Sequence, residues 1–272
     1  MGGACRPVGS PPARAPGPAA RIRFAVPSDS LIPSGPRGAS IRRGRAILEA
    51  TSDSLPAHVG NRLRCASCHL DGGTRASSGS WVGVYASFPQ YNARGARMFR
   101  LEDRINECLR RSLSGRPLPP GSRDMADMVA YFAFLSRDVP AGVKAPWLGM
   151  RKLAPRPADA TAGSKIYAAQ CSRCHGVGGE GFAAPGAPPV WGSQSFAIGA
   201  GMARLNTAAA FIRWNMPFDR PGTLTDSQAF DVAAFVLAHP RPDTPGKELD
   251  WPRGGKPDDC PYPTVAGQTP ER

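Results

Sequence analysis

Two short motifs in the chain have residue types and spacing that suit covalent attachment of a cofactor. The residues from Cys65 to His69 and those from Cys171 to His175 both read C-x-x-C-H. In this motif the two thiols bond to a haem, and the adjacent histidine becomes the proximal ligand of the iron. Both motifs have the histidine in register, although the chain has only 4 histidines. We therefore expect two covalent haem c groups, attached at Cys65, Cys68, Cys171 and Cys174 and ligated by His69 and His175.

Two other chemistries use similar cysteine spacings. A thioredoxin-like redox pair lies next to a βαβ pattern, and no strand-rich run accompanies either motif. A zinc site would gather the cysteines and histidines into one cluster. The motifs stand in separate halves of the chain, each in a similar context, so the haem interpretation is preferred.

The segments around each motif repeat. The first half opens with a helical segment at 40–49 that contains a glycine, and it closes at 122–132. In the closing segment Met125, Met128, Val129 and Phe132 share one helical face. The second half opens at 162–167 and closes after Thr225-Asp226-Ser227-Gln228, a capping-box pattern. The order helix, haem motif, long loop, helix predicts an all-α fold of two tandem cytochrome c-type domains, with the first and last helices of each crossing at a glycine.

This repeat divides the chain into five parts. Residues 1–37 are rich in proline, glycine, arginine and alanine and are predicted to be disordered. The remaining parts are a first cytochrome c domain at 38–141, a packed proline-rich linker at 142–158, a second cytochrome c domain at 159–250 and a tail at 251–272.

Each iron needs a distal ligand, and both halves offer a sulfur atom at the same place. Cys108 and Met216 each precede the closing helix of their half. A thiolate lowers the haem potential and a thioether raises it, so electrons are expected to pass from haem 1 to haem 2. The other candidates are Met202, Met125 and Met128, which are expected to pack in the core, and His58 and His239, which are expected to be structural. Met98 could also reach haem 1 and stays open.

The composition limits the partners. The formal net charge of +13 favours anionic partners, but no nucleic-acid-binding motif accompanies it. No apolar run is long enough for a transmembrane helix. The first 37 residues lack the apolar core of a signal peptide. Because haem c is attached outside the bacterial cytoplasm, we expect a periplasmic protein whose leader is not visible in this sequence.

Longer phrases around these motifs resemble the thiosulfate dehydrogenase family, which joins two thiosulfates into tetrathionate. The resemblance covers roughly residues 40–262. The matching phrases are Leu55 to Asn61, Cys65 to Leu70, Trp81 to Tyr85, Phe88 to Tyr91, Glu102 to Cys108, Arg111 to Ser112, Pro188 to Gly192, Ser195 to Phe196, Gly199 to Met202, Asn215 to Pro217, His239 to Pro242 and Trp251 to Tyr262.

The resemblance implies a catalytic haem 1 with His/Cys ligation and an electron-relay haem 2. By motif position it places Arg94, Arg104 and Ser112 around the substrate, with Cys108 loosening from the iron and joining thiosulfate covalently. Guanidinium groups suit sulfonate oxygens. Arg97, Arg110 and Arg111 stand nearby but could form a solvated face. The implied partners are thiosulfate or tetrathionate and an external acceptor such as a small cytochrome c.

One position departs from part of the family. Some members have a lysine before the methionine as an alternative ligand, and here that residue is Asn215, so a Lys/Met switch is not expected. Three other functions were considered: a dihaem electron carrier without a substrate, a Sox-type sulfur-oxidation cytochrome and a dihaem peroxidase. A carrier needs no anion pocket, the match across both halves argues against the Sox type, and Cys108 argues against a peroxidase.

Overall fold

The computed structural model of the chain describes residues 22–182 and 186–265, and its elements are mainly helical. Cys5 and residues 266–272 of the tail lie outside the described residues. The helices are α1 (Gly35–Glu49), α2 (Thr51–Ser54), α3 (Leu70–Gly73), α4 (Leu101–Arg111), α5 (Arg123–Leu135), α6 (Ala160–Gln170), α7 (Ser172–His175), α8 (Leu205–Asn215) and α9 (Asp226–Leu237). Short 3-10 turns cover Asp29–Leu31, Cys65–Ser67, Ala76–Ser78, Tyr85–Ser87, Gly201–Ala203 and Lys247–Leu249. An antiparallel hairpin of β1 (Gln90–Asn92) and β2 (Arg97–Phe99) pairs Tyr91 with Met98. Among the described residues, none of the helices is long and apolar enough to cross a membrane.

The first half is built on the predicted crossing of its first and last helices, α1 and α5. A Cβ atom on Gly44 of α1 would lie 1.9 Å from the backbone oxygen of Asp127 in α5, so only glycine allows this approach. The predicted stripe of α5 is buried, with Met125 and Met128 at 1% and 0% exposure. Ser122 caps α5 by accepting a hydrogen bond from the backbone N–H of Met125.

The second half repeats the arrangement with α6 and α9. A Cβ atom on Gly163 would lie 2.0 Å from the backbone oxygen of Asp231. The capping box predicted at the start of α9 is confirmed: Gln228 N–H donates to Thr225 Oγ1, and Thr225 N–H donates to Gln228 Oε1. The two halves therefore share one arrangement. In each, the helix before the haem motif crosses the helix that closes the half.

Part of the segment predicted to be disordered has structure. Residues 22–37 include the turn Asp29–Leu31 and the start of α1 at Gly35, with Pro36 in the first helical turn. Residues 1–21 lie outside the described part of the chain. The proline-rich linker lies against the first half: Ala145 is buried, and Trp147 Nε1 donates to the backbone oxygen of Val82 at 2.8 Å.

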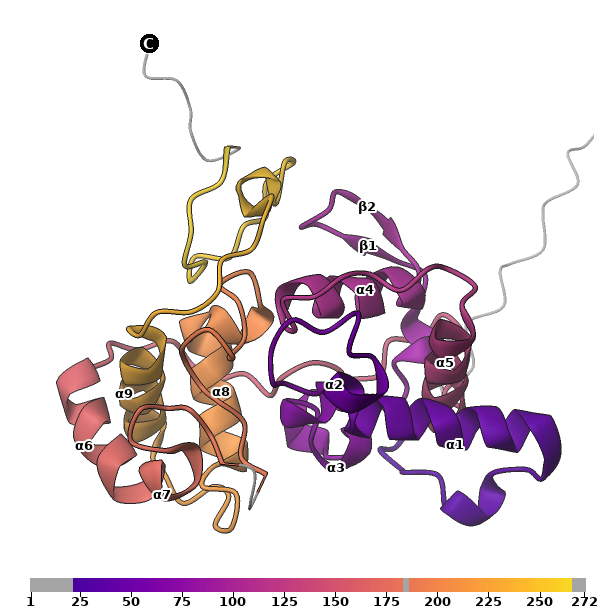
Figure 1. Cartoon of the computed structure of the whole chain (residues 1–272), viewed down its shortest axis with the longest axis horizontal. Helices are drawn as coiled ribbons and strands as arrows, with labels where there is room; N and C mark the ends of the chain where they lie inside the picture. The colour runs from indigo at the N-terminus through magenta and orange to yellow at the C-terminus, as the bar shows by residue number, and fades with distance from the viewer. Residues whose placement is uncertain (1–21, 183–185, 266–272) are drawn as a thin grey trace, which may run out of the picture.

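The two halves lie side by side and share contacts (Figure 1). Phe196, Ala200 and Ala203 from the second half belong to the hydrophobic core of the first. Asn61 Nδ2 donates to the backbone oxygens of Ser112 and Ser195 and so joins one half to the other. The C-terminal segment (yellow in Figure 1) runs back from the second half towards the hairpin of the first, where Trp251 N–H donates to Arg94 O.

Candidate functional site

The two motif histidines are held in the same way. Nδ1 of His69 lies 2.7 Å from the backbone oxygen of Gly79, and Nδ1 of His175 lies 2.8 Å from that of Pro188. Each carbonyl fixes the ring orientation and places the proton on Nδ1, which leaves Nε2 as the ligating atom. Burial lowers the pKa of His69 to about 4 and lowers the pKa of His175 as well. Both rings are therefore neutral at physiological pH, the form that binds iron.

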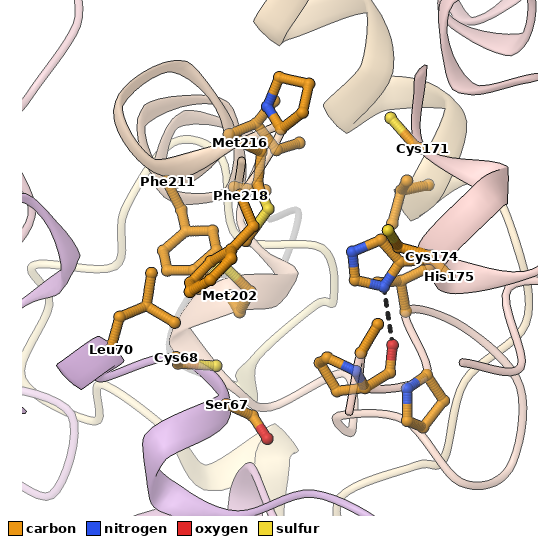
Figure 2. A pocket seen from close by; sticks show the side chains of 18 of the residues that line it. Ser67, Cys68, Leu70, Cys171, Cys174, His175, Met202, Phe211, Met216 and Phe218 are labelled. Carbon is orange, nitrogen blue, oxygen red and sulfur yellow. Dashed lines mark hydrogen bonds between the residues drawn. The ribbon is translucent and has the colours of Figure 1, made fainter. Parts of the chain in front are cut away.

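A cavity of about 510 Å³ opens in front of His175. Its lining is mostly apolar, and its volume lies within the range of cofactor sites, ~300–1,000 Å³. Figure 2 shows Cys171, Cys174 and His175 on one side, with Met216 and Met202 on the opposite side. Cys68 of the first motif also lines this cavity, so the second site reaches the attachment residues of the first.

The position of Met216 is fixed by the residue before it. Asn215, at 0% exposure, ends α8 and bonds across to the first half. Ser77 Oγ donates to Asn215 Oδ1 at 2.8 Å, while Asn215 Nδ2 donates to the backbone oxygens of Ser77 and Phe211. This buried amide occupies the position where some family members have lysine, and it ties the segment of Met216 to the first half.

In the first half, Cys108 of α4 approaches the attachment cysteines. Burial and, to a smaller extent, the nearby Cys108 raise the pKa of the Cys65 and Cys68 thiols to about 12. The Cys108 sulfur therefore lies near both thiols of the motif that ends at His69. The structure brings together the four residues that the sequence assigned to the attachment and ligation of haem 1.

Two predicted substrate residues accompany Cys108 on α4. Arg104 precedes it by one turn and Ser112, the C-cap, follows it by one turn, so all three lie along one face of the helix. Arg104 is close enough to His69 to lower its pKa. Within the described ranges no hydrogen bond or ion pair holds the Arg104 guanidinium, which leaves its donors available to an anion.

Arg94 lies next to this face but is already engaged. Its Nη1 donates to the backbone oxygen of Gly199 at 2.7 Å, and its guanidinium stacks over Trp251. Burial lowers the pKa of Arg94, and the neighbouring charges of Arg111 and Arg104 lower it further. Arg94 therefore contributes positive potential here with part of its hydrogen-bonding capacity already used.

Asp250 organises this cluster and was missed by sequence reasoning. It accepts two hydrogen bonds from Arg111 at 2.8 and 2.6 Å and one from Tyr262 Oη at 2.6 Å. Its Oδ2 lies 3.9 Å from Arg94 Nε. Burial lowers the pKa of Arg111, but the carboxylates of Glu107 and Asp250 outweigh it and raise the pKa overall. Arg111 is thus a buried structural link, and a solvated face is the wrong description of it.

The rival ligands lie elsewhere, except for Met202. His58 Nδ1 faces Arg116 O, while His239 stacks on Trp191 with ring centroids 4.0 Å apart. Met98 is 55% exposed on the hairpin. Met202 lines the same cavity as Met216 (Figure 2), so geometry alone offers two thioethers to the second site.

The donor sets fit two haem groups. Each half places a neutral, oriented imidazole beside two cysteines, with a sulfur side chain available from another element. The second half adds an apolar cavity of suitable size. Several buried donors also lack a partner within the described residues, among them Trp214 Nε1 and Arg241 Nη1. Such unpaired donors are expected where a polar edge of a cofactor belongs.

Comparison with known proteins finds one matching family model in each half of the chain. The family model described as the SoxA/TsdA cytochrome c domain matches residues 57–141. The model described as cytochrome c oxidase, cbb3-type, subunit III matches residues 158–236.

Similar proteins cover most of the chain. A thiosulfate dehydrogenase of Psychrobacter arcticus is 41% identical over 242 residues, covering 86% of this chain and 73% of that protein. One of Allochromatium vinosum is 45% identical over 230 residues, covering 81% and 85%. The solved structure of the thiosulfate dehydrogenase TsdBA of Marichromatium purpuratum, as isolated, superposes with a TM-score of 0.76 at 34% identity over 82% of this chain. This chain spans 50% of that longer one.

Proposed function

The chain belongs to the thiosulfate dehydrogenase family, and we propose that it oxidises two thiosulfates to tetrathionate. The observation that supports this most directly is the face of α4. Cys108 lies close enough to the attachment cysteines to raise the pKa of both, and one turn to either side stand a guanidinium without a partner among the described residues and a hydroxyl side chain. A simple electron carrier has no use for such an anion-binding face.

The family models indicate haem c in both domains, and the finer assignment is part of the proposal. Cys65 and Cys68 would attach haem 1, and His69 and Cys108 would ligate its iron. Cys171 and Cys174 would attach haem 2, and His175 and Met216 would ligate its iron. When bound, each haem takes up and releases one electron at a time.

The protein side chains bind and orient the substrate at the first site. Thiosulfate carries two negative charges, and Arg104 and Arg94 supply positive potential beside Cys108. Arg104 has free donors for the sulfonate oxygens, and charge-assisted hydrogen bonds of this kind are among the stronger ones. Ser112 adds a hydroxyl one turn further along α4. These residues hold the outer sulfur of thiosulfate next to the Cys108 sulfur.

The proposed reaction passes through one covalent intermediate on Cys108. Its thiolate and the outer sulfur of a first thiosulfate form an S–S bond, and two electrons leave for the acceptors. The outer sulfur of a second thiosulfate then attacks the bound thiosulfate sulfur. That attack breaks the bond to Cys108, releases tetrathionate and restores the thiolate. The two electrons pass from the first site to the second and then to an external acceptor, for which we propose a small periplasmic cytochrome c.

An anaerobic assay of the haem-loaded protein tests this function. With thiosulfate and an artificial acceptor, Cys108→Gly should lose acceptor reduction by at least ~100-fold, because it removes the reacting sulfur. Cys260→Ser is the matched control, since that thiol lies in the C-terminal segment and donates a hydrogen bond to Tyr262 O. Arg104→Gln should raise the KM for thiosulfate several-fold, whereas Arg110→Gln on the exposed side of α4 should not.

The same assay separates enzyme from carrier. Full thiosulfate-dependent reduction by Cys108→Gly would disprove the role of Cys108. If the parent protein shows no thiosulfate oxidation yet exchanges electrons with a cytochrome, the chain is an electron carrier and the proposed function is wrong.

A further inference from the structure

Arg241 follows α9 and lies behind the wall of the second cavity. Its guanidinium stacks over the ring of Phe196 at 4.4 Å, and its Nη2 donates to the backbone oxygen of Val236 at 2.8 Å. Phe196 and Val236 both line the cavity in front of His175. Two of the groups that hold this guanidinium are therefore part of the cavity wall.

Among the described residues, the charge of Arg241 has no counter-ion. Its Nη1 atom is buried and has no hydrogen-bond partner, and no carboxylate in the described ranges pairs with it. Burial alone lowers its pKa to about 10. Arg111 shows the ordinary solution for a half-buried guanidinium in this protein, with two carboxylates bonded to it. A half-buried cation without a counter-ion and a buried donor without a hydrogen bond are both costly, so a group that supplies an anion there is strongly favoured.

The apolar lining of the cavity limits which anion could bind to Arg241. Its lining is mostly apolar, so a small hydrated anion would gain little from entering it. A haem is apolar over most of its surface and carries two carboxylates, its propionates, along one edge. Only such a ligand fills an apolar cavity and also delivers an anion to its wall.

We propose that Arg241 binds a propionate of the haem in the second domain. The free Nη1 donates to a carboxylate oxygen, and the stacking on Phe196 holds the guanidinium plane in place. The assignment rests on the proposed function only in that it requires a haem at Cys171, Cys174 and His175.

This contact has a consequence for the second site as an electron acceptor. A cation next to the propionate offsets one negative charge at the haem edge, which makes the reduced, more negative state easier to reach. Arg241 therefore raises the midpoint potential of haem 2 and helps to draw electrons from the first site. It acts through the cofactor carboxylate and touches no substrate.

Spectroelectrochemical titration of the haem-loaded protein tests the assignment. Arg241→Gln should keep two covalent haems by intact mass but lower the midpoint potential of the methionine-ligated haem and leave that of the other haem unchanged. Arg156→Gln is the control, because this arginine of the linker loses the same charge but has its Nη atoms bonded to Ser227 and Asp226. An unchanged haem 2 potential in Arg241→Gln, with both haems attached, would overturn the proposal.

A second measurement covers the case in which Arg241→Gln does not fold. Arg241→Lys keeps the charge but loses the planar fork, so the resonance Raman band of propionate bending should shift relative to the parent. An identical band in both proteins would refute the contact. A parent protein whose mass shows no haem on Cys171 and Cys174 would refute the proposed cofactor assignment itself, and the Arg241 proposal with it.

Discussion

Replacing Asp250 by asparagine should destabilise the protein and weaken substrate binding together. The carboxylate is buried and accepts three hydrogen bonds of 2.6–2.8 Å, two from Arg111 and one from Tyr262. The substituted amide would retain one acceptor oxygen but would leave Arg111 with a single carboxylate partner, Glu107. Breaking a buried ion pair from one side costs ~3–5 kcal/mol, and the retained acceptor suggests about 3 kcal/mol for Asp250→Asn.

Thermal unfolding of the haem-loaded protein, followed by circular dichroism, measures the first effect. Asp243→Asn is the matched control: its side chain is 70% exposed, accepts a hydrogen bond from Thr244 N–H and pairs with Lys247, so ~1 kcal/mol or less is expected. The second effect is a raised KM for thiosulfate, because Arg94 beside α4 and Arg111 at the end of α4 lose the carboxylate that links them. If Asp250→Asn unfolds no earlier than Asp243→Asn, the carboxylate does not hold this cluster and the reasoning is refuted.

Two further predictions concern the helix crossings and the second iron ligand. Gly44→Ala and Gly163→Ala should each lower the free energy of unfolding by about 3 kcal/mol, because the new Cβ would overlap a backbone oxygen. Gly201→Ala is the control, because no atom lies within 4 Å of its Cβ position. Equal stability of all three variants would contradict the close helix crossing. Met216→Ala should abolish the near-infrared band of a methionine-ligated haem and lower the midpoint potential of that haem. Met202→Ala should leave the band and the potential unchanged. The reverse result would make Met202 the ligand.

The periodic and motif-based features were predictable from the sequence. The capping box at Thr225 and the stripe through Met125 and Met128 are local patterns, because neighbouring residues alone decide them. The glycines of the crossing helices were predictable for a related reason, since the repeat placed one in each opening helix. In both halves the structure puts that glycine against the backbone of the closing helix.

The contacts between distant parts of the chain were not predictable. Asp250 carries no local signal of its bond to Arg111, which lies 139 residues earlier. Arg94 was assigned to the substrate, yet the structure also bonds it to Gly199 of the second half, which no pattern near Arg94 indicates. Tertiary pairings of single polar side chains have no periodicity, so a single amino-acid sequence does not reveal them.

The hydrogen bonds of Asn215 affect more than the position of Met216, because they also join the two halves at Ser77. Ser77 lies two residues before Gly79, whose carbonyl orients His69, and Asn215 directly precedes Met216. A short run of chain thus connects the proposed proximal ligand of one redox centre to the proposed distal ligand of the other. An electron moves fastest between centres whose surroundings shift little when the charge changes, that is, at low reorganisation energy. We expect this shared clamp to keep both ligand shells stiff, so that the two electrons of each S–S bond cross between the halves without rearranging either one.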